Sequence, residues 1–130
     1  MKLFLDNEQL CQLAQFVLID EVCDYTMEDN GRIVPYLPDK MDSVCPQISI
    51  GAVLDWLPPT IPSEVSYPSE MPLNIGKSPL DSGLVWTLTY GTDETWYVYE
   101  FDEPELIDGA FNLLMKLFHD GKIAQPNNGH

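Results

Sequence analysis

The residues best suited to acid–base or nucleophilic chemistry near neutral pH are few in this chain: two histidines and three cysteines. His119 is predicted to lie in the last turn of a helix, where a cation interacts favourably with the helix terminus and a capping role accounts for it. Cys11, Cys23 and Cys45 form no Cys-x-x-Cys pair, so we expect packed thiols rather than a zinc site or a disulfide framework. Neither histidine nor thiolate catalysis is indicated.

Two short motifs bear on phosphate and calcium binding. Gly76-Lys77-Ser78 matches the end of a phosphate-binding loop, but that loop requires a further glycine where Met71 stands and a helix where Pro79 stands. The acidic turn around Gly31 matches part of a calcium loop, but with this glycine in the sixth position the twelfth is Leu37 instead of the required glutamate. We expect no nucleotide site, no metal site and no cofactor.

Carboxylates are the abundant functional group: 21 aspartates and glutamates stand against 6 lysines and arginines, which gives a formal net charge of -15. Such a charge excludes direct attraction to nucleic acid or to anionic lipid. A net charge of magnitude about 2–8 keeps a small domain soluble, and a larger one costs stability through self-repulsion. The excess is compatible with a merely solvated surface, but it favours a surface complementary to a basic partner.

The elements that must position these acids begin with a predicted long helix from Asn7 to about Met27. This segment contains neither glycine nor proline, and its apolar residues recur at helical spacing. Asp6 followed by Gln9 is close to the pattern of a capping box. We therefore expect the helix to begin directly after Asp6.

Three acids, Asp20, Glu21 and Asp24, would lie near the C-terminal end of that helix. Negative charge there opposes the helix macrodipole. Their placement therefore indicates a role other than stability.

The middle of the chain is rich in proline: residues 35–79 hold nine of the eleven. Regular structure there is expected to be short. Residues 33–37 predict a short strand, and Pro35 places it at a sheet edge. Residues 47–57 predict either a buried strand or a brief helix, with Ser49 as a possible cap.

The C-terminal third predicts a β-hairpin and a helix. Residues 84–90 and 95–101 are rich in β-branched and aromatic residues, and residues 91–94 have the length of a hairpin loop. Helical spacing of apolar residues follows from Pro104, with Asp102 or Glu103 as the expected cap and Gly121 as the end.

The predicted hairpin carries many aromatic residues. Alternation places Trp86, Leu88 and Tyr90 on one face, and it gives Tyr97, Tyr99 and Phe101 a shared face of the neighbouring strand. We expect one side of the hairpin to carry more apolar surface than the core covers. Aromatics beside acids are suited to contact with lysines and arginines.

The pattern as a whole predicts one α+β domain over residues 1–125, with a flexible tail at 126–130. Two amphipathic helices would pack on a small, mainly antiparallel sheet that contains the hairpin. There is no run of about 18 apolar residues, and Asp6 interrupts the apolar start too early for a signal peptide. We expect a cytoplasmic protein without a membrane partner.

The function that this composition favours is that of an acidic protein-binding inhibitor. Its most concrete form is an immunity protein that occludes the basic nucleic-acid-binding cleft of a toxin nuclease by steric and electrostatic means, without covalent chemistry. The residues expected to contact such a basic protein partner are Asp20, Glu21, Asp24, Asp93, Glu94, Trp96, Tyr97, Tyr99, Glu100, Asp102 and Glu103.

Two alternatives remain open from the sequence. A virus-encoded DNA mimic directed at a defence protein would space its carboxylates like duplex phosphates along a strip. A small acidic enzyme or ligand-binding module would have a deep pocket near His119 or a buried carboxylate pair.

Overall fold

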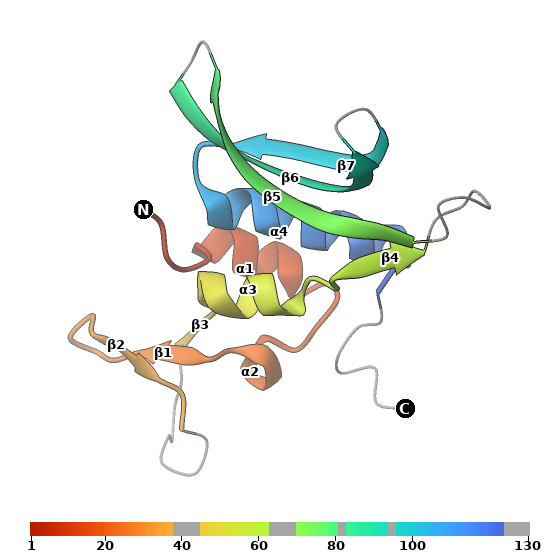
Figure 1. Cartoon of the computed structure of the whole chain (residues 1–130). Coiled ribbons are helices and arrows are strands. Elements are labelled where there is room, and N and C mark those ends of the chain that lie inside the picture. The colour runs from red at the N-terminus through yellow and green to blue at the C-terminus, as the bar shows by residue number, and fades with distance from the viewer. Residues whose placement is uncertain (38–44, 63–69, 81–82, 94–95, 124–130) are drawn as a thin grey trace.

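The computed structural model describes residues 1–37, 45–62, 70–80, 83–93 and 96–123 (Figure 1). It has the predicted α+β class, with four helices and two antiparallel sheets in this part of the chain. The elements in order are α1 (Asn7–Leu13), α2 (Ile19–Val22), β1 (Tyr25–Met27), β2 (Ile33–Pro35), β3 (Pro46–Gln47), α3 (Ile50–Trp56), β4 (Thr60–Pro62), β5 (Glu70–Leu80), β6 (Gly83–Asp93), β7 (Trp96–Glu103) and α4 (Leu106–His119).

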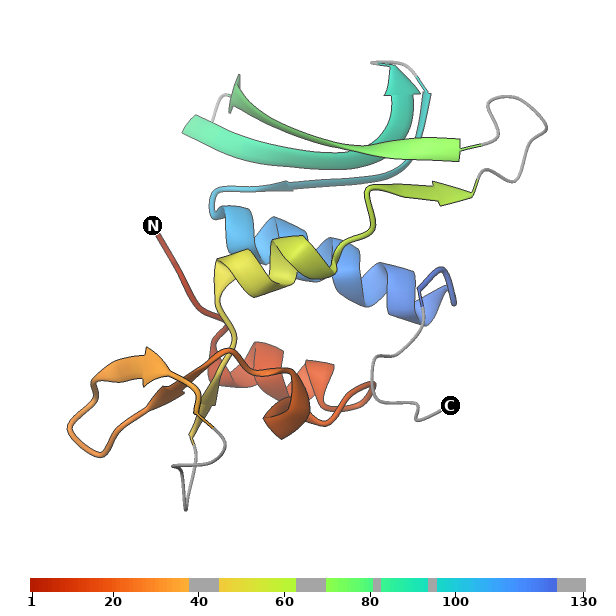
Figure 2. The same ribbon diagram turned by 60° about the horizontal axis from the view of Figure 1, so that its bottom comes forward.

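The molecule is layered around α3 and α4. The larger sheet, of order β4-β5-β6-β7, lies on one side of this helix pair. On the other side lie α1, α2 and the smaller sheet of order β2-β1-β3, as Figure 2 shows. The helix pair is therefore covered from both sides.

Most of α4 is buried, because it contacts the larger sheet, α3 and α1. Its buried residues are Leu106, Ile107, Gly109, Ala110, Phe111, Leu113, Leu114, Leu117 and Phe118. Gly109 allows β6 to come close, since a Cβ atom at this position would lie 2.6 Å from Leu88 Cδ1. Phe118 joins the layers by stacking on Phe16 at 5.3 Å and by an edge contact with Trp56 at 5.5 Å.

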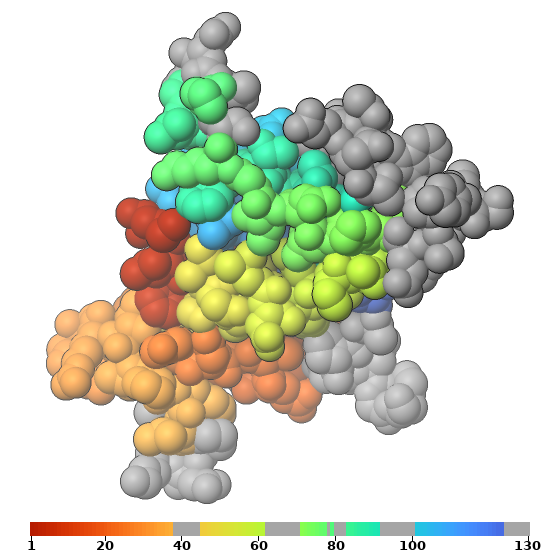
Figure 3. Space-filling view, viewed as in Figure 1, coloured from red at the N-terminus to blue at the C-terminus, as the bar shows by residue number. Residues whose placement is uncertain are grey.

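The N-terminal segment crosses between layers before α1 begins. The backbone of Leu5 donates to the carbonyl of Ile48, and Phe4 forms an isolated bridge with Ser49. The space-filling view in Figure 3 shows this red segment directly against the blue atoms of the C-terminal part of the chain. The start of α1 is thus brought beside the start of α4.

The single long helix predicted for residues 7–27 is wrong. The capping box forms as expected, with Asp6 accepting from the Gln9 backbone and the Gln9 side chain accepting from the Asp6 backbone. However, α1 ends at Leu13, and the chain turns so that Phe16 and Val17 reach the core. Burial of these side chains outweighs the helix propensity of a segment without glycine or proline.

Two consequences correct the expectations for this segment. Cys11 lies in α1 and Cys23 follows α2, so no common helix holds them; Cys23 is buried as expected, whereas Cys11 and Cys45 are exposed. Asp20 and Glu21 lie in the first turn of α2 instead of at a helix C-terminus. The macrodipole therefore does not oppose them.

The middle of the chain is partly as predicted. β2 is an edge strand, and within residues 47–57 the helix α3 forms over Ile50–Trp56, capped by Ser49 Oγ, which accepts from the Ala52 backbone at 3.2 Å. β5 is longer than the prolines indicated, at 11 residues. It tolerates Pro79 because β4 pairs only with residues 70–72, so that the rest of β5 is an edge strand.

The hairpin is confirmed as the antiparallel pair β6 and β7, with Leu88 opposite Phe101 and Tyr90 opposite Tyr99. β6 extends to Asp93, so most of the expected loop belongs to the strand. β7 extends to Glu103, and α4 begins at Leu106 with Glu105 in the cap position. The expected cap at Asp102 or Glu103 is therefore wrong.

Candidate functional site

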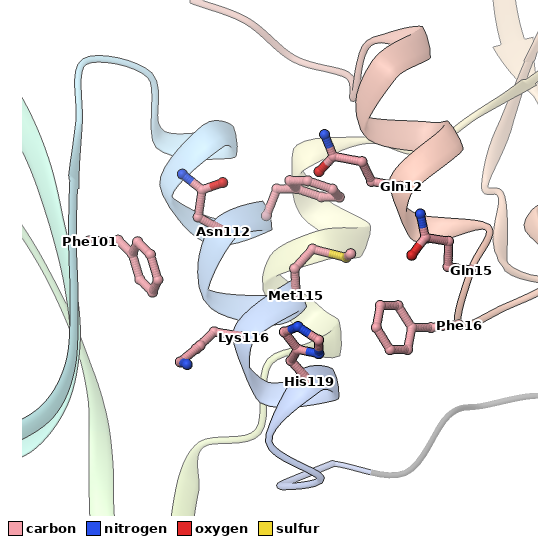
Figure 4. A pocket seen from close by; sticks show the side chains of 9 residues that line it. Gln12, Gln15, Phe16, Phe101, Asn112, Met115, Lys116 and His119 are labelled. Atoms are coloured by element: carbon pink, nitrogen blue, oxygen red, sulfur yellow. The ribbon is translucent and has the colours of Figure 1, made fainter.

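One stripe of α4 is left uncovered between α1 and β7. It consists of Asp108, Asn112, Met115, Lys116 and His119, which are half-buried or exposed. All of these residues except Asp108 line a hollow of about 320 Å³ (Figure 4). The residues that line this hollow are Gln12, Gln15, Phe16, Phe101, Phe111, Asn112, Met115, Lys116 and His119.

Apolar side chains from three elements meet in this hollow. Phe101 comes from β7, Met115 and Phe111 come from α4, and Phe16 follows α1. His119, in the last turn of α4 as predicted, lies edge-on to Phe16 at 6.3 Å. We call this part of the hollow the apolar end.

A second hollow of about 270 Å³ adjoins the first and shares Gln12, Phe111 and Asn112 with it. Carboxylates dominate this second hollow. It is lined by Asp6, Glu8, Glu103 and Asp108; the Glu105 carboxylate is not part of this lining but accepts from the backbone of Lys2, which is. We call these five carboxylates the acidic cluster, and the two hollows together the α4 groove.

Lys2 is the one lysine or arginine of the described residues that contacts the acidic cluster. Its Nζ donates to Asp6 at 2.9 Å, to Gln9 at 3.0 Å and to Asp108 at 2.7 Å. Desolvation lowers the pKa of the Lys2 ammonium, but the hydrogen bonds to Asp108 and Asp6 outweigh it and the pKa is raised. The Lys2 ammonium thus pairs with two of the five carboxylates, Asp6 and Asp108.

Helix starts hold the acidic cluster in place. The hydrogen bond from the Gln9 backbone, followed by that from Lys2, lowers the pKa of Asp6. Asp108 lies in the first turn of α4, and Glu103 accepts from Asn112 at 3.1 Å. Negative charge at these positions is stabilised by the helix dipoles.

Of the residues predicted to bind a partner, Asp24 instead makes hydrogen bonds within the fold. It is half-buried and accepts from the Ser49 backbone at 2.9 Å and from Ser49 Oγ at 2.5 Å. Asp20 and Glu21 are exposed on α2. Asp102 is exposed and accepts from Thr87 Oγ1 at 2.6 Å.

The remaining predicted contacts lie outside the described side chains. Glu94 is not described at all, and only the strand backbone is described for the others, Asp93, Trp96, Tyr97, Tyr99 and Glu100. On β6, the face of Leu88 and Tyr90 is buried and belongs to the core. Trp86 on this face is half-buried beneath Lys77 Nζ, at 5.1 Å from its ring.

The predicted surface is not gathered in one place. α2, with Asp20 and Glu21, lies on the opposite side of the α3 and α4 layer from the β6–β7 hairpin (Figures 1 and 2). Of the predicted acids, the structure brings Glu103 into the α4 groove.

The other four carboxylates of the acidic cluster were not among the predicted contacts. Asp6 was predicted only as a helix cap, and no partner contact was predicted for Glu8, Glu105 or Asp108. The sequence does not reveal the bridge between Phe4 and Ser49, which brings the starts of α1 and α4 together.

Comparison with models of protein families, with curated proteins and with solved structures finds no significant match. Within the described residues, no three metal-binding side chains lie close enough to hold an ion. The same residues include no helix that is long and apolar enough to cross a membrane.

Proposed function

We propose that this protein binds a basic protein through the acidic cluster and blocks that partner's own binding surface. The observation that supports the proposal is that five carboxylates gather at the starts of α1 and α4 and the end of β7, while the Lys2 ammonium pairs with only two of them, Asp6 and Asp108. The most concrete form of this function is that of an immunity protein on the nucleic-acid-binding cleft of a toxin nuclease.

The acidic cluster retains capacity for cationic partners. A carboxylate can accept about four hydrogen bonds. Glu8 is exposed, and among the described residues it has no hydrogen-bond partner, while Glu103 and Glu105 each accept one hydrogen bond. Lysines or arginines of a partner can therefore pair with these oxygens without displacing Lys2.

A nuclease cleft is a suitable target because it binds phosphates through lysines and arginines. Carboxylates that pair with those groups make them unavailable to nucleic acid, and the protein then covers the cleft. The remaining net charge, including exposed Asp20 and Glu21 on α2, would accelerate association over a longer range. No bond is made or broken in this mechanism.

The carboxylates are grouped in one patch, and this favours a local docking site over the mimicry of DNA. A mimic needs negative charges along a strip with the spacing of duplex phosphates. The acidic cluster is instead confined to one end of the α4 groove.

The test uses the immobilised protein to isolate a basic partner and then measures that partner's cleavage of DNA and RNA. We expect the protein to abolish cleavage, and we expect the complex to dissociate above a few hundred millimolar salt. Glu8→Lys should weaken binding by about tenfold or more, as expected for a close charge pair in an interface. The control is Asp55→Lys, the same charge change at an exposed acid of α3 outside the groove.

Circular dichroism should report an unchanged fold for both variants. Equal weakening by the two substitutions, or a complex that does not respond to salt, contradicts the proposal. A captured partner whose cleavage continues in the complex contradicts the nuclease form of it.

A further inference from the structure

We infer that the α4 groove grips one partner segment at two points, an apolar side chain in the apolar end and a lysine or arginine at the acidic cluster. The inference rests on the proposed function and specifies the chemistry of the partner. The two hollows share Gln12, Phe111 and Asn112, so a single segment lying along α4 would contact both.

The apolar end has the size and lining for one large side chain. Its volume of about 320 Å³ is at the lower limit of ligand pockets, which measure about 300–1,000 Å³. Phe16, Phe101 and Met115 are only half-buried although each packs against the core. An aromatic or long aliphatic side chain would cover their remaining surface, and the flexible thioether of Met115 can adapt to either.

The charges of the groove fix the direction of the segment. The acidic cluster lies at the start of α4, whereas Lys116 and His119 lie near its end. Lys116 pairs with Asp120 at 3.5 Å, so the far end offers no excess of negative charge for a cation. The cationic side chain of the partner must therefore lie toward Asp108, and the apolar one toward Met115.

The spacing of the two points follows from the geometry of α4. At a rise of about 1.5 Å per residue, Met115 lies about 10 Å beyond Asp108 along the helix, and His119 about 16 Å beyond it. An extended chain advances about 3.3 Å per residue, so it spans this interval in about three to five residues. The segment should thus carry a lysine or arginine about three to five residues from an aromatic or long aliphatic residue.

Synthetic peptides with a fluorescent label test this chemistry directly. The first peptide has a lysine pair and a phenylalanine about four residues apart in a glycine–serine chain. The second has serine in place of phenylalanine, and the third has glutamine in place of the lysines. Fluorescence anisotropy should give the first peptide at least about tenfold higher affinity than either of the others, because a buried phenyl ring adds to the charge contacts.

Variants locate the two points. Met115→Gln should remove the advantage of the phenylalanine peptide while leaving the affinity for the lysine-only peptide unchanged. Met27→Gln, at an exposed methionine of β1, is the matched control and should change neither. Glu8→Gln should weaken both lysine peptides and reduce their salt dependence.

The outcomes separate this inference from the proposed function. Equal affinity of the phenylalanine and serine peptides, with both weakened by salt, overturns the two-point grip and supports charge-based docking alone. An advantage that survives Met115→Gln but is lost in Met27→Gln also overturns it. If no lysine peptide shows salt-sensitive binding, both the inference and the proposed function are contradicted.

Discussion

Removal of the Lys2 ammonium should lower the stability of the fold but raise the affinity for a basic partner. Lys2→Met keeps a long apolar side chain but removes the donor that contacts Asp6, Gln9 and Asp108. The fold should become less stable, because the carboxylates then repel one another without a counter-ion. Affinity for a basic partner should rise, because among the described residues no other lysine or arginine contacts the acidic cluster.

The size of the stability loss can be worked out from the two ion pairs. The pair with Asp108 joins side chains that are 27% and 28% exposed. Hydrogen bonds to charged groups contribute about 1.5–3 kcal/mol, and partial solvent screening reduces this to about 1.5 kcal/mol. The i,i+4 pair with Asp6, which is 53% exposed, adds about 0.3–0.5 kcal/mol.

The expected loss is therefore about 2 kcal/mol, which corresponds to a fall in Tm of about 7 °C for a domain of 130 residues. The gain in affinity is smaller. Two unit charges about 7 Å apart in water repel by about 0.6 kcal/mol, so binding of a basic partner should tighten about threefold.

The pH dependence of this effect has a defined sign. The pKa of Lys2 is raised, so its contribution is complete below its unfolded value of about 10.4 and is lost as the pH rises through the folded pKa. The pKa of Asp6 is lowered, so its contribution is present above about pH 4 and is lost as the pH falls through the folded pKa. The difference in Tm between wild type and Lys2→Met should be constant near neutral pH and shrink in acid.

Thermal unfolding followed by circular dichroism at low salt measures these values. Arg32→Met is the matched control, because this arginine is exposed and the substitution removes the same charge. It should change the stability by less than about 0.5 kcal/mol. An unchanged Tm in Lys2→Met, or a fall equal to that of Arg32→Met, would show that the ion pairs of Lys2 do not stabilise the fold.

Five further substitutions test the packing that positions the groove. Asp24→Ala and Ser49→Ala should show a coupling of about 1–2 kcal/mol in a double-mutant cycle measured by urea unfolding, and additive losses would mean that their hydrogen bonds do not couple them. Gly51→Ala should stabilise the protein by about 0.5–1 kcal/mol, since its Cβ would be 3.7 Å from the nearest atom. Gly109→Ala should destabilise it by about 1 kcal/mol, because its Cβ would lie 2.6 Å from Leu88 Cδ1. Changes of the same sign in the free energy of urea unfolding would contradict this pair of predictions. Tyr90→Phe should cost about 1–2 kcal/mol, because it removes the hydrogen bond of 2.7 Å that the Tyr90 hydroxyl, whose pKa is raised by burial, donates to the Pro58 carbonyl; an unchanged urea midpoint would show that this bond contributes nothing.

The features that the sequence predicted well depend on short-range interactions. The capping box at Asp6, the cap at Ser49, and the end of α4 at Gly121, which has a φ of +69°, each involve residues within a few positions. The hairpin follows from two adjacent strands with a short connection. Local propensity decides such features, so a single sequence reveals them.

The features that the sequence did not predict depend on contacts between distant segments. The turn after Leu13 forms because Phe16 stacks on Phe118, far away in the chain. The acidic cluster depends on Lys2 and Asp108, which are 106 positions apart. Periodicity and charge runs carry no information on such pairings, and for this reason the contacts predicted from the sequence lie on α2 and the hairpin, whereas the structure gathers the acidic cluster at the starts of α1 and α4.

A chemical-shift map tests most directly whether a basic partner binds in the α4 groove. The isotope-labelled protein is titrated with the phenylalanine-containing lysine peptide, or with an isolated basic partner, and the amide resonances are followed by NMR. If the partner binds in the α4 groove, the largest shifts fall on residues 6–9, 103–108 and 112–116. Shifts confined to α2 and the smaller sheet, or spread evenly over the exposed acids, would contradict it.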